Sequence, residues 1–309
     1  MRLIKPDFEI WNQEEGLEGV YKQIERAGRV CYKSEDKITE NSAKEFVDRM
    51  IKSGHGAMLE HGTVYLKIPY GTMDDRGEFS NEPIVIKYID NPYSVVMNNS
   101  ENDYWYITSN YRVIIENEWI DDLQYLCEPT EFHAKRITVH FVCDRGVSHE
   151  FVRHRVMSFA QESTRYCNYS KDKFGNELTF ILPPWVDERQ LGEQNSQELL
   201  IQMGSLSNPT YTQEDLNELY FLFSLASSEV QYFNLINNGW KPQQARAVLP
   251  NSLKTELVVT GFASDWEHFF ELRDAGSAHP QARELAHPLH MEFLRRNYLV
   301  DLYDEANPD

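Results

Sequence analysis

The chain has 309 residues, 41% hydrophobic and 13% aromatic, which is enough apolar material to build a sizeable core. Its 30 Lys and Arg against 49 Asp and Glu give a formal net charge of −19, which argues against the broad basic face needed to bind nucleic acid. No apolar run approaches the roughly 20 residues of a membrane span, and residues 1–11 lack the apolar centre of a signal peptide. We therefore expect a cytoplasmic globular protein that binds neither nucleic acid nor a membrane.

The cysteines are scattered along the chain: Cys31, Cys127, Cys143 and Cys167. They form no CxxC pair and show no zinc-binding spacing. Because disulfides are rare in the cytosol, we expect reduced thiols. The pattern assigns none of them an activating base or helix N-terminus, so we expect no cysteine nucleophile.

The first part of the chain predicts a helix, a strand and an irregular segment. Apolar residues recur at helical spacing over 41–53, with Asn41 as the N-cap and Gly54 after the end. Residues 64–68 alternate as a strand. Residues 71–105 contain much Gly, Asp, Asn and Pro, with a short β-like run at 83–88. We interpret this segment as an irregular insertion or a hairpin.

A half-buried strand is predicted where apolar and polar residues alternate over 137–143. A turn at 144–146 follows. Ser148 is then positioned to cap a helix that runs through the triplet Arg153-His154-Arg155. Past Ser158 the apolar pattern fades, and the residues alternate as in an extended loop.

The second half predicts a strand followed by mostly helical segments. A strand over 178–182 stops at two prolines, and 187–212 is interpreted as a loop or a loose helical segment. A long helix then begins at the N-cap Thr212, with Asp215 at its third position, and ends before Gly239. Its predicted buried face is Leu216, Leu219, Phe223, Ala226, Val230 and Phe233.

The last elements are a short helix over 242–249, a buried strand over 256–260, a helix over 265–273 capped by Ser264, and a final helix that begins near Pro280 and runs past Met291. The strands and helices do not alternate regularly. We therefore predict an α+β fold with a mainly antiparallel sheet and packed helices. The sequence has no Gly-x-Gly-x-x-Gly motif, which argues against a Rossmann dinucleotide site.

A cluster of cations stands out in this acidic chain. Three arginines and a histidine fall within 153–165. Such a cluster favours a specific anion, because the planar fork of arginine binds two phosphate oxygens at once. On a helix, Arg153 and Arg155 point roughly 200° apart, so the pair predicts two ligands or one long ligand. The alternative is a solvated charged face in which these arginines pair with Glu150 and Glu162.

The spacing of the cluster resembles the signature of flavin-dependent thymidylate synthases, which methylate dUMP with the help of FAD. Its fixed positions are Arg153, His154, Arg155, Ser163 and Arg165. Further segments are similar to family segments: Arg29–Cys31, His55–His61, Ala245–Pro250, Glu256–Gly261, Leu272-Arg273 and Ala278–Gln281. The resemblance covers roughly 19–68 and 135–295 and leaves an insertion at about 70–130 outside it. It implies a single catalytic domain over 1–309 with the fold of that family.

The resemblance implies a role for each matching residue. The expected dUMP ligands are Glu150, Arg153, Gln161, Ser163, Arg165, Arg246 and Arg273. The expected FAD contacts are Cys31, His55, Arg153, His154, Arg155, Gln161 and His268. Arg273 is expected to face the uracil ring as the catalytic residue. Many members have Asn-Glu where Ala160-Gln161 stand here, and Gln in place of Glu150. A carboxylate at position 150 is unfavourable beside a phosphate unless it faces the base or an arginine.

The same resemblance implies the reaction: dUMP becomes dTMP with methylenetetrahydrofolate as carbon donor and with FAD reduced by NADPH. It also implies a homotetramer with shared active sites. Two other functions stay open, a nucleotide-binding regulator without redox chemistry and a metal-dependent nucleotide hydrolase that uses His279, His287 and His290. These histidines do not complete a zinc motif, so we expect no metal. Ser163 lacks a nucleophile elbow and is interpreted as a phosphate ligand.

Overall fold

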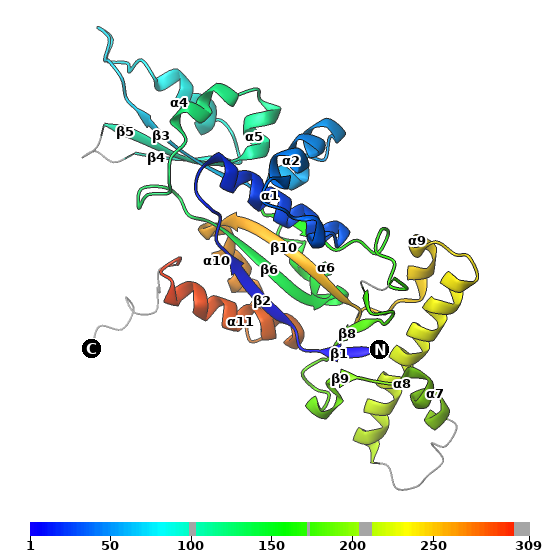
Figure 1. The fold of residues 1–309 in the computed structure, drawn as a ribbon. Helices are drawn as coiled ribbons and strands as arrows, with labels where there is room; N and C mark the ends of the chain where they lie inside the picture. The colour runs from blue at the N-terminus through cyan, green and yellow to red at the C-terminus, as the bar shows by residue number, and fades with distance from the viewer. Residues whose placement is uncertain (99–102, 172–173, 204–211, 300–309) are drawn as a thin grey trace, which may run out of the picture.

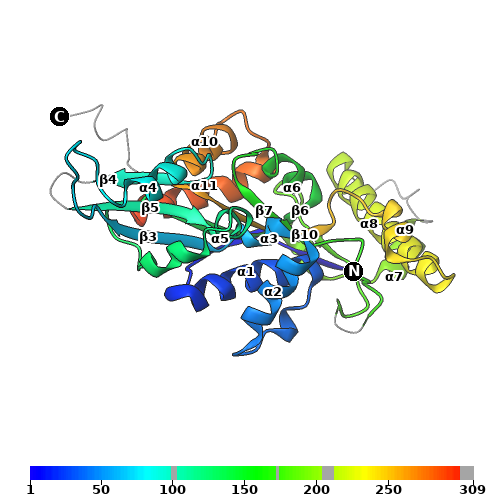
Figure 2. The same ribbon diagram turned by 90° about the horizontal axis from the view of Figure 1, so that it is seen from above.

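The computed structural model describes residues 1–98, 103–171, 174–203 and 212–299. The fold is α+β, as predicted, with one four-stranded sheet and two three-stranded sheets. The four-stranded sheet lies at the centre of an elongated molecule, and each smaller sheet lies toward one end (Figures 1 and 2). In the described ranges, no helix is both long and apolar enough to cross a bilayer.

The central sheet has the order β2-β6-β10-β7 and is antiparallel throughout. Its strands are β2 (Asp7–Trp11), β6 (Arg136–Asp144), β7 (Ser158–Gln161) and β10 (Lys254–Phe262). The strands predicted at 137–143 and 256–260 are therefore confirmed. They pair along their whole length, with Val139 opposite Val259.

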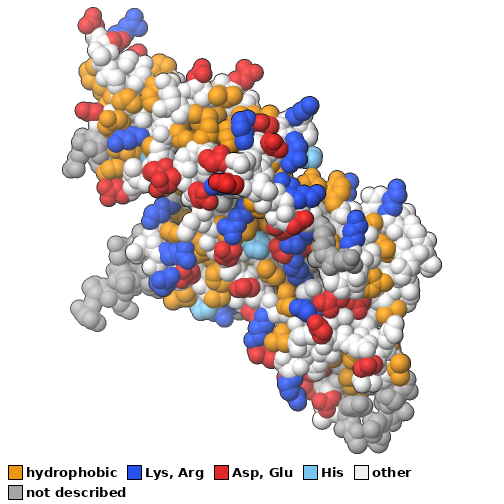
Figure 3. Space-filling model, viewed as in Figure 1, with side chains coloured by type: hydrophobic (Ala, Val, Ile, Leu, Met, Phe, Trp, Pro, Cys, Tyr) orange, Lys and Arg blue, Asp and Glu red, His pale blue; other side chains and the backbone are white. Residues whose placement is uncertain are grey.

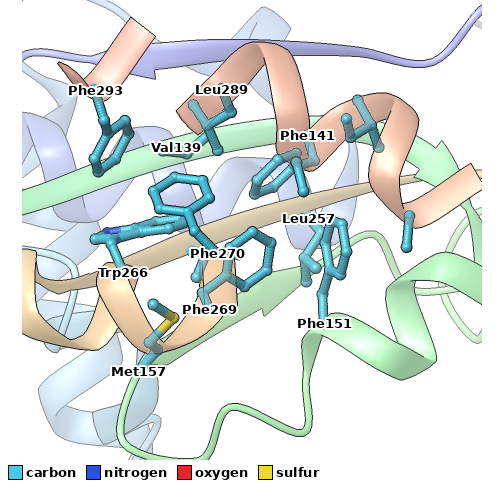
Figure 4. Packing of buried hydrophobic residues seen from close by; sticks show 14 of the residues in the cluster. Val139, Phe141, Phe151, Met157, Leu257, Trp266, Phe269, Phe270, Leu289 and Phe293 are labelled. Atoms are coloured by element: carbon cyan, nitrogen blue, oxygen red, sulfur yellow. The ribbon is translucent and has the colours of Figure 1, made fainter. Parts of the chain in front are cut away.

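Two helices cover one face of this sheet and form the main core (Figure 4). They are α10 (Ala263–Arg273) and α11 (Pro280–Arg295), both close to the predicted ranges. Trp266 is fully buried there, and its indole N–H donates to the carbonyl of Ile137 at 3.2 Å. Helix α1 (Gly16–Tyr32), which the sequence reading missed, packs Ala27 and Val30 on the other face.

The start of α10 differs from the prediction that Ser264 caps it. The N-cap position is Phe262, and the Asp265 carboxylate accepts a hydrogen bond from the Phe262 N–H at 2.8 Å. The helix follows β10 without a loop, so Ser264 already lies in its first turn. The acidic residue one turn in therefore satisfies the first backbone donor.

The insertion forms an ordered unit at one end of the molecule (Figure 1). Its strands β4 (Val95–Asn98) and β5 (Tyr104–Asn110) join β3 (Thr63–Pro69), which precedes the insertion, in a sheet of the order β3-β5-β4. Its helical segments are α4 (Glu82–Ile89), α5 (Tyr111–Glu116) and a 3₁₀ turn at Ile120–Tyr125. This unit shares a core with α1 and α2 (Ser42–Ser53), which has its N-cap position at Asn41 and ends at Gly54, as predicted.

Of the two readings of 71–105, an irregular segment or a hairpin, the hairpin is confirmed by the antiparallel pair β4 and β5, but helix α4 was not predicted. The run at 83–88, interpreted as β-like, lies in helix α4. Pro83 stands in the first turn of that helix, where its missing N–H costs nothing. Val85 and Tyr88 are three apart and both buried, so tertiary burial of one helical face decides the conformation.

The opposite end is built around α8 (Gln213–Asn237), which begins with the predicted reciprocal cap between Thr212 and Asp215. The other elements of this end are β1 (Arg2–Ile4), β8 (Thr179–Ile181), β9 (Gly192–Glu193), a 3₁₀ turn at Glu188–Gln190, α7 (Ser196–Met203), α9 (Pro242–Ala245) and a 3₁₀ turn at Arg246–Val248. The strand and short helix predicted at 178–182 and 242–249 are thus confirmed. The segment 187–212 contains β9 and helix α7, and its residues 204–211 lie outside the described residues.

The buried face of α8 is rotated from the predicted one. Of the six predicted residues only Phe223 and Ala226 are buried, while Leu222, Leu225 and Tyr232 are buried in place of the others. Glu229 is also buried and accepts a hydrogen bond from the Leu178 N–H at 2.8 Å. The buried face of α8 thus includes a carboxylate that binds the backbone just before β8, and apolar spacing alone does not predict such a residue.

Candidate active site

The signature segment is a helix end followed by turns and a strand. Helix α6 spans Arg145–Phe151 and is capped by Asp144, whose carboxylate accepts from the Val147 N–H at 2.8 Å. The prediction that Ser148 caps a helix running through 153–155 is therefore wrong. The Ser148 hydroxyl instead donates back to the Arg145 carbonyl as an interior helix residue. The triplet Arg153-His154-Arg155 lies in turns and not in a helix. The argument that Arg153 and Arg155 point roughly 200° apart, which assumes a helix, therefore does not apply.

Arg273 is brought to this segment from the end of α10. Its Nη1 donates to the Glu150 carboxylate at 2.7 Å, and its Nη2 donates to the Glu150 carbonyl at 2.8 Å. Its Nε donates to Nε2 of His154 at 3.1 Å. The carboxylate at position 150 thus faces an arginine, as the sequence reading required. Three directed contacts fix the guanidinium, which leaves two N–H groups for a ligand.

His154 is held neutral by its surroundings. Burial, with Arg273 and His268 nearby, lowers the pKa of His154 to about 4. Because Nε2 accepts from Arg273, the imidazole proton is on Nδ1. The ring also packs on Phe269 at 5.0 Å and meets His268 edge-on at 5.8 Å. His268 is itself exposed and lies 3.2 Å from Glu271.

Acid should remove a defined part of the folding stability through His154. Its folded pKa of about 4 lies below the ordinary value of 6.5, so its contribution is full above pH 6.5 and is lost as the pH falls toward 4. His154→Gln keeps an acceptor for Arg273 but does not titrate. We expect the stability advantage of the parent over this variant to shrink between about pH 7 and about pH 4.5.

Urea unfolding at the two pH values measures that advantage. The matched control is Gln213→Ala on α8, an exposed residue without a titratable group, which should show the same pH dependence as the parent. An advantage that stays constant with pH would show that the imidazole does not resist protonation in the folded state.

The second group of predicted residues lies on the loop after β7. The Ser163 hydroxyl accepts from the Arg165 N–H at 3.3 Å, and the Ser163 N–H donates to the Cys31 carbonyl at 3.0 Å. Arg246 reaches this loop and donates to the Thr164 hydroxyl at 3.4 Å. The Ser163 hydroxyl and the exposed Arg165 thus belong to this loop, and the exposed Arg246 lies next to it. This donor set suits a phosphate group.

A network of buried and half-buried charges, which was not predicted from the sequence, contacts this loop through Glu162. Lys254 contacts the carboxylates of Glu162, at 3.0 Å, and Glu256. Lys33 donates to Glu256 at 2.6 Å, and His140 pairs with the same carboxylate at 3.0 Å. Although burial opposes its charge, these partners hold the pKa of Glu256 well below its usual range. Alternation along β10 was the available signal, because Lys254 and Glu256 project on one side of that strand.

The ion pairs expected for a solvated charged face, in which Arg153 and Arg155 pair with Glu150 and Glu162, do not form. Glu150 pairs with Arg273 and Glu162 with Lys254, whereas Arg153 donates to the His149 carbonyl at 3.3 Å. Over the face drawn in Figure 3, acidic and basic side chains are interspersed.

The remaining predicted residues lie around these two groups. Gln161 donates to the Ser148 hydroxyl at 2.8 Å, which links β7 to α6. Cys31 lies in α1 next to this strand, and burial raises the pKa of its thiol to about 11. Such a thiol stays protonated, which agrees with the expectation of no cysteine nucleophile. His55 is exposed before α3 (Gly56–Leu59) and contacts neither group through a side-chain bond among the described residues.

The C-terminal histidines meet one carboxylate. His287 and His290 lie 3.0 Å and 2.9 Å from Asp274, the residue after Arg273. His290 also stacks on Phe270 at 4.5 Å, while His279 packs edge-on against Trp185 at 5.9 Å. Within the described ranges, no group of three or more potential ligands is arranged to hold a metal ion.

A family model described as thymidylate synthase complementing protein matches residues 86–296, more than half of the chain. The chain belongs to this family. The match includes residues 86–130 of the insertion, which was expected to lie outside the resemblance. Both site groups, from Glu150 to Arg273, fall inside the matched range.

Several known proteins are similar to parts of the chain. A flavin-dependent thymidylate synthase of Mycobacterium avium is 34% identical over 152 residues, which cover 49% of this chain and 53% of that protein. One of Corynebacterium aurimucosum is 25% identical over 279 residues, which cover 89% and 76%. Against the mycobacterial relatives, the chain spans about half of their length.

Among solved structures, the chain is similar to a UMP/dUMP methylase of Streptomyces cacaoi bound with 5-Br dUMP. The sequence identity is 16% and the TM-score is 0.39, over 96% of this chain and 93% of that one.

Proposed function

We propose that the protein is a flavin-dependent thymidylate synthase that converts dUMP to dTMP. Methylenetetrahydrofolate is the carbon donor, NADPH is the reductant and FAD is the cofactor. The active unit is a homotetramer in which neighbouring subunits complete each site. The observation that carries this proposal is the fixed Arg273 guanidinium, held by Glu150 and His154 beside the signature segment.

The two groups of residues fit the two ends of dUMP. Ser163, Arg165 and Arg246 offer a hydroxyl and two guanidiniums to the phosphate, which is the most strongly charged part of the substrate. Arg273 is directed at the uracil ring, where negative charge develops as C5 is activated. A preorganised cation there stabilises the transition state more than the ground state.

The chemistry transfers one carbon to C5 of the ring. The methylene carbon of the folate forms a bond to C5, the C5 proton leaves, and the link to the folate nitrogen breaks. The reduced flavin, when bound, supplies the hydride that completes the methyl group. The protein binds, orients and stabilises charge, which agrees with a site rich in arginine in which the Cys31 thiol stays protonated.

Spectroscopy of the purified protein tests the proposal directly. We expect a yellow protein whose flavin absorbance bleaches with NADPH without oxygen, and which forms dTMP when dUMP and methylenetetrahydrofolate are added. A protein that takes up no flavin contradicts it, and one that binds dUMP without forming dTMP is a regulator. A metal-dependent hydrolase would instead bind a divalent metal ion through His279, His287 and His290, and metal analysis of the purified protein tests that alternative.

Removing one phosphate ligand should weaken substrate binding selectively. A charge-assisted hydrogen bond contributes about 1.5–3 kcal/mol, so Arg165→Ala should raise the Kd for dUMP about tenfold to a hundredfold. FAD content should not change. Calorimetric titration with dUMP measures the effect, and Arg189→Ala, an exposed arginine paired with Asp187, is the control. An unchanged Kd would remove Arg165 from the phosphate site.

A further inference from the structure

One carboxylate, that of Glu256, holds two lysines that come from distant parts of the chain. Glu256 lies near the start of β10, Lys254 stands two residues before it, and Lys33 directly follows α1. Both ammonium groups contact the same oxygen, Oε1, with Lys33 at 2.6 Å. Nε2 of His140 lies 3.0 Å from the other oxygen. The two lysines and Glu256 are at most 19% exposed, so salt and water screen these charges only weakly.

Lys254 connects this carboxylate to the residue that precedes Ser163. Its Nζ lies 3.0 Å from the Glu162 carboxylate, which also accepts from the Tyr169 hydroxyl at 2.9 Å. Burial raises the pKa of Tyr169, so this hydroxyl stays protonated and remains a donor. Because Glu162 stands before the loop and Tyr169 after it, the Glu162 side chain joins the two ends of the segment that carries Ser163 and Arg165.

Lys33 connects the same carboxylate to the end of α1. It occupies the C-cap position of this helix with a left-handed backbone, at a φ of 45°. The Cys31 carbonyl, two residues earlier, accepts the hydrogen bond from the Ser163 N–H at 3.0 Å. The contact between Lys33 and Glu256 therefore fixes the helix end that holds the backbone of Ser163.

The two connections meet at Glu256 and converge on Ser163. Since both ammonium groups contact one oxygen atom, they lie close together and repel each other when the negative charge is removed. A displacement of either lysine moves a support of the loop. A binding group keeps its geometry only when the residues behind it hold it within about 0.5 Å, so the directed contacts of Ser163 and Arg165 with a phosphate depend on this carboxylate.

We propose that Glu256 is a positioning residue for substrate binding, which holds Lys254 and Lys33 together and thereby fixes the Ser163 loop in the geometry that binds the phosphate of dUMP. The proposal rests on the function proposed above and extends it to a residue that does not touch the substrate. A carboxylate that only stabilises the fold would change the unfolding midpoint and leave the affinity for dUMP unaltered. The two roles therefore predict different measurements.

Glu256→Gln tests the role, because it keeps the size of the side chain and removes its charge. We expect the Kd and the KM for dUMP to rise about tenfold. The kcat at saturating dUMP and the Kd for FAD should stay within about twofold, because the contacts of Arg273 are unaltered. Inorganic phosphate, titrated as a competitor of dUMP, should lose affinity by a similar factor. If this variant does not fold, Glu256→Asp keeps the charge on a shorter side chain and should raise the Kd about threefold.

A double-mutant cycle with Arg165→Ala shows whether Glu256 acts through the loop. Residues that act through one another have non-additive effects on the free energy of binding. In the Arg165→Ala background, Glu256→Gln should raise the Kd for dUMP less than about threefold, because the guanidinium that the loop positions is already absent. Additive effects would show that Glu256 acts elsewhere and overturn the proposal.

The matched control is Asp122→Asn in the insertion, a buried carboxylate that pairs with Lys87 and accepts from the Tyr88 hydroxyl at 2.7 Å. It should lower the unfolding midpoint in urea and leave the Kd for dUMP within about twofold. If Glu256→Gln behaves in the same way while the parent forms dTMP, the positioning role is overturned and the function stands. If the parent takes up no FAD but Glu256→Gln still weakens dUMP binding selectively, the positioning role stands and the flavin-dependent function is removed.

Discussion

Replacing Arg273 by lysine should lower the rate of dTMP formation about 10²–10³-fold, as expected for the loss of one preorganised donor group in a transition state. Lysine keeps the positive charge but not the planar fork that reaches Glu150 and His154 together. The cation would then lose its fixed direction toward the uracil ring. FAD binding and the reduction of FAD by NADPH should persist, because they do not depend on that direction.

Measuring the two half-reactions separately tests this role. Flavin bleaching by NADPH reports the first, and dTMP formation reports the second. Arg295→Lys on α11, an exposed arginine paired with Glu292, is the matched control and should turn over normally. If Arg273 only complements the C-terminus of α10, lysine keeps that charge, so the variant should unfold at the parental midpoint and form dTMP at the parental rate. That result would end the catalytic assignment.

Truncating Trp266 to alanine should destabilise the fold by about 3–5 kcal/mol. The indole is fully buried between the central sheet and α11, with Phe269 at 5.2 Å and Phe293 at 5.3 Å (Figure 4). The variant creates a cavity and also removes the donor to the Ile137 carbonyl. Urea unfolding should give a lower midpoint with an unchanged slope.

The matched control is Trp240→Ala, since this indole is 47% exposed. Its effect should stay within about 0.5 kcal/mol. Trp266→Phe keeps most of the packing and should fall between the two. Equal midpoints for Trp266→Ala and Trp240→Ala would show that the cluster around Trp266 does not limit stability.

The parts of the fold that were predictable from sequence depend on neighbours along the chain. The reciprocal cap of Thr212 and Asp215 is a pattern within four consecutive residues, and both hydrogen bonds form. The strand at 137–143 alternates because helices cover one of its faces, and the strand at 256–260 is a short apolar run because both of its faces are buried. Such signals require no knowledge of what packs against the segment.

The errors arise where a distant residue decides the local structure. Two positions compete to cap the helix before the signature, and Asp144 prevails over Ser148 because β6 ends at Asp144, while the Arg145 N–H already donates to the Asn251 carbonyl at 2.9 Å. The contacts of Arg273 cross 119 and 123 residues of sequence. The family resemblance implied that Arg273 lies near the substrate. The contacts by which Glu150 neutralises and orients its guanidinium are visible only in the folded chain.

Strand β10 contacts the loop that carries Ser163 near its start, and a pocket of about 620 Å³ lined by Phe262 lies at its other end. Glu256 belongs to the network behind the loop, and Phe262 lines the pocket. The two residues are roughly 20 Å apart at the usual rise per strand residue. Strands β6 and β7 bind β10 on both sides, so this strand is a spacer of fixed length. Binding at one end cannot draw the other closer without breaking the sheet, and any adjustment to a ligand must come from the turns at 152–157 and the loop at 162–167.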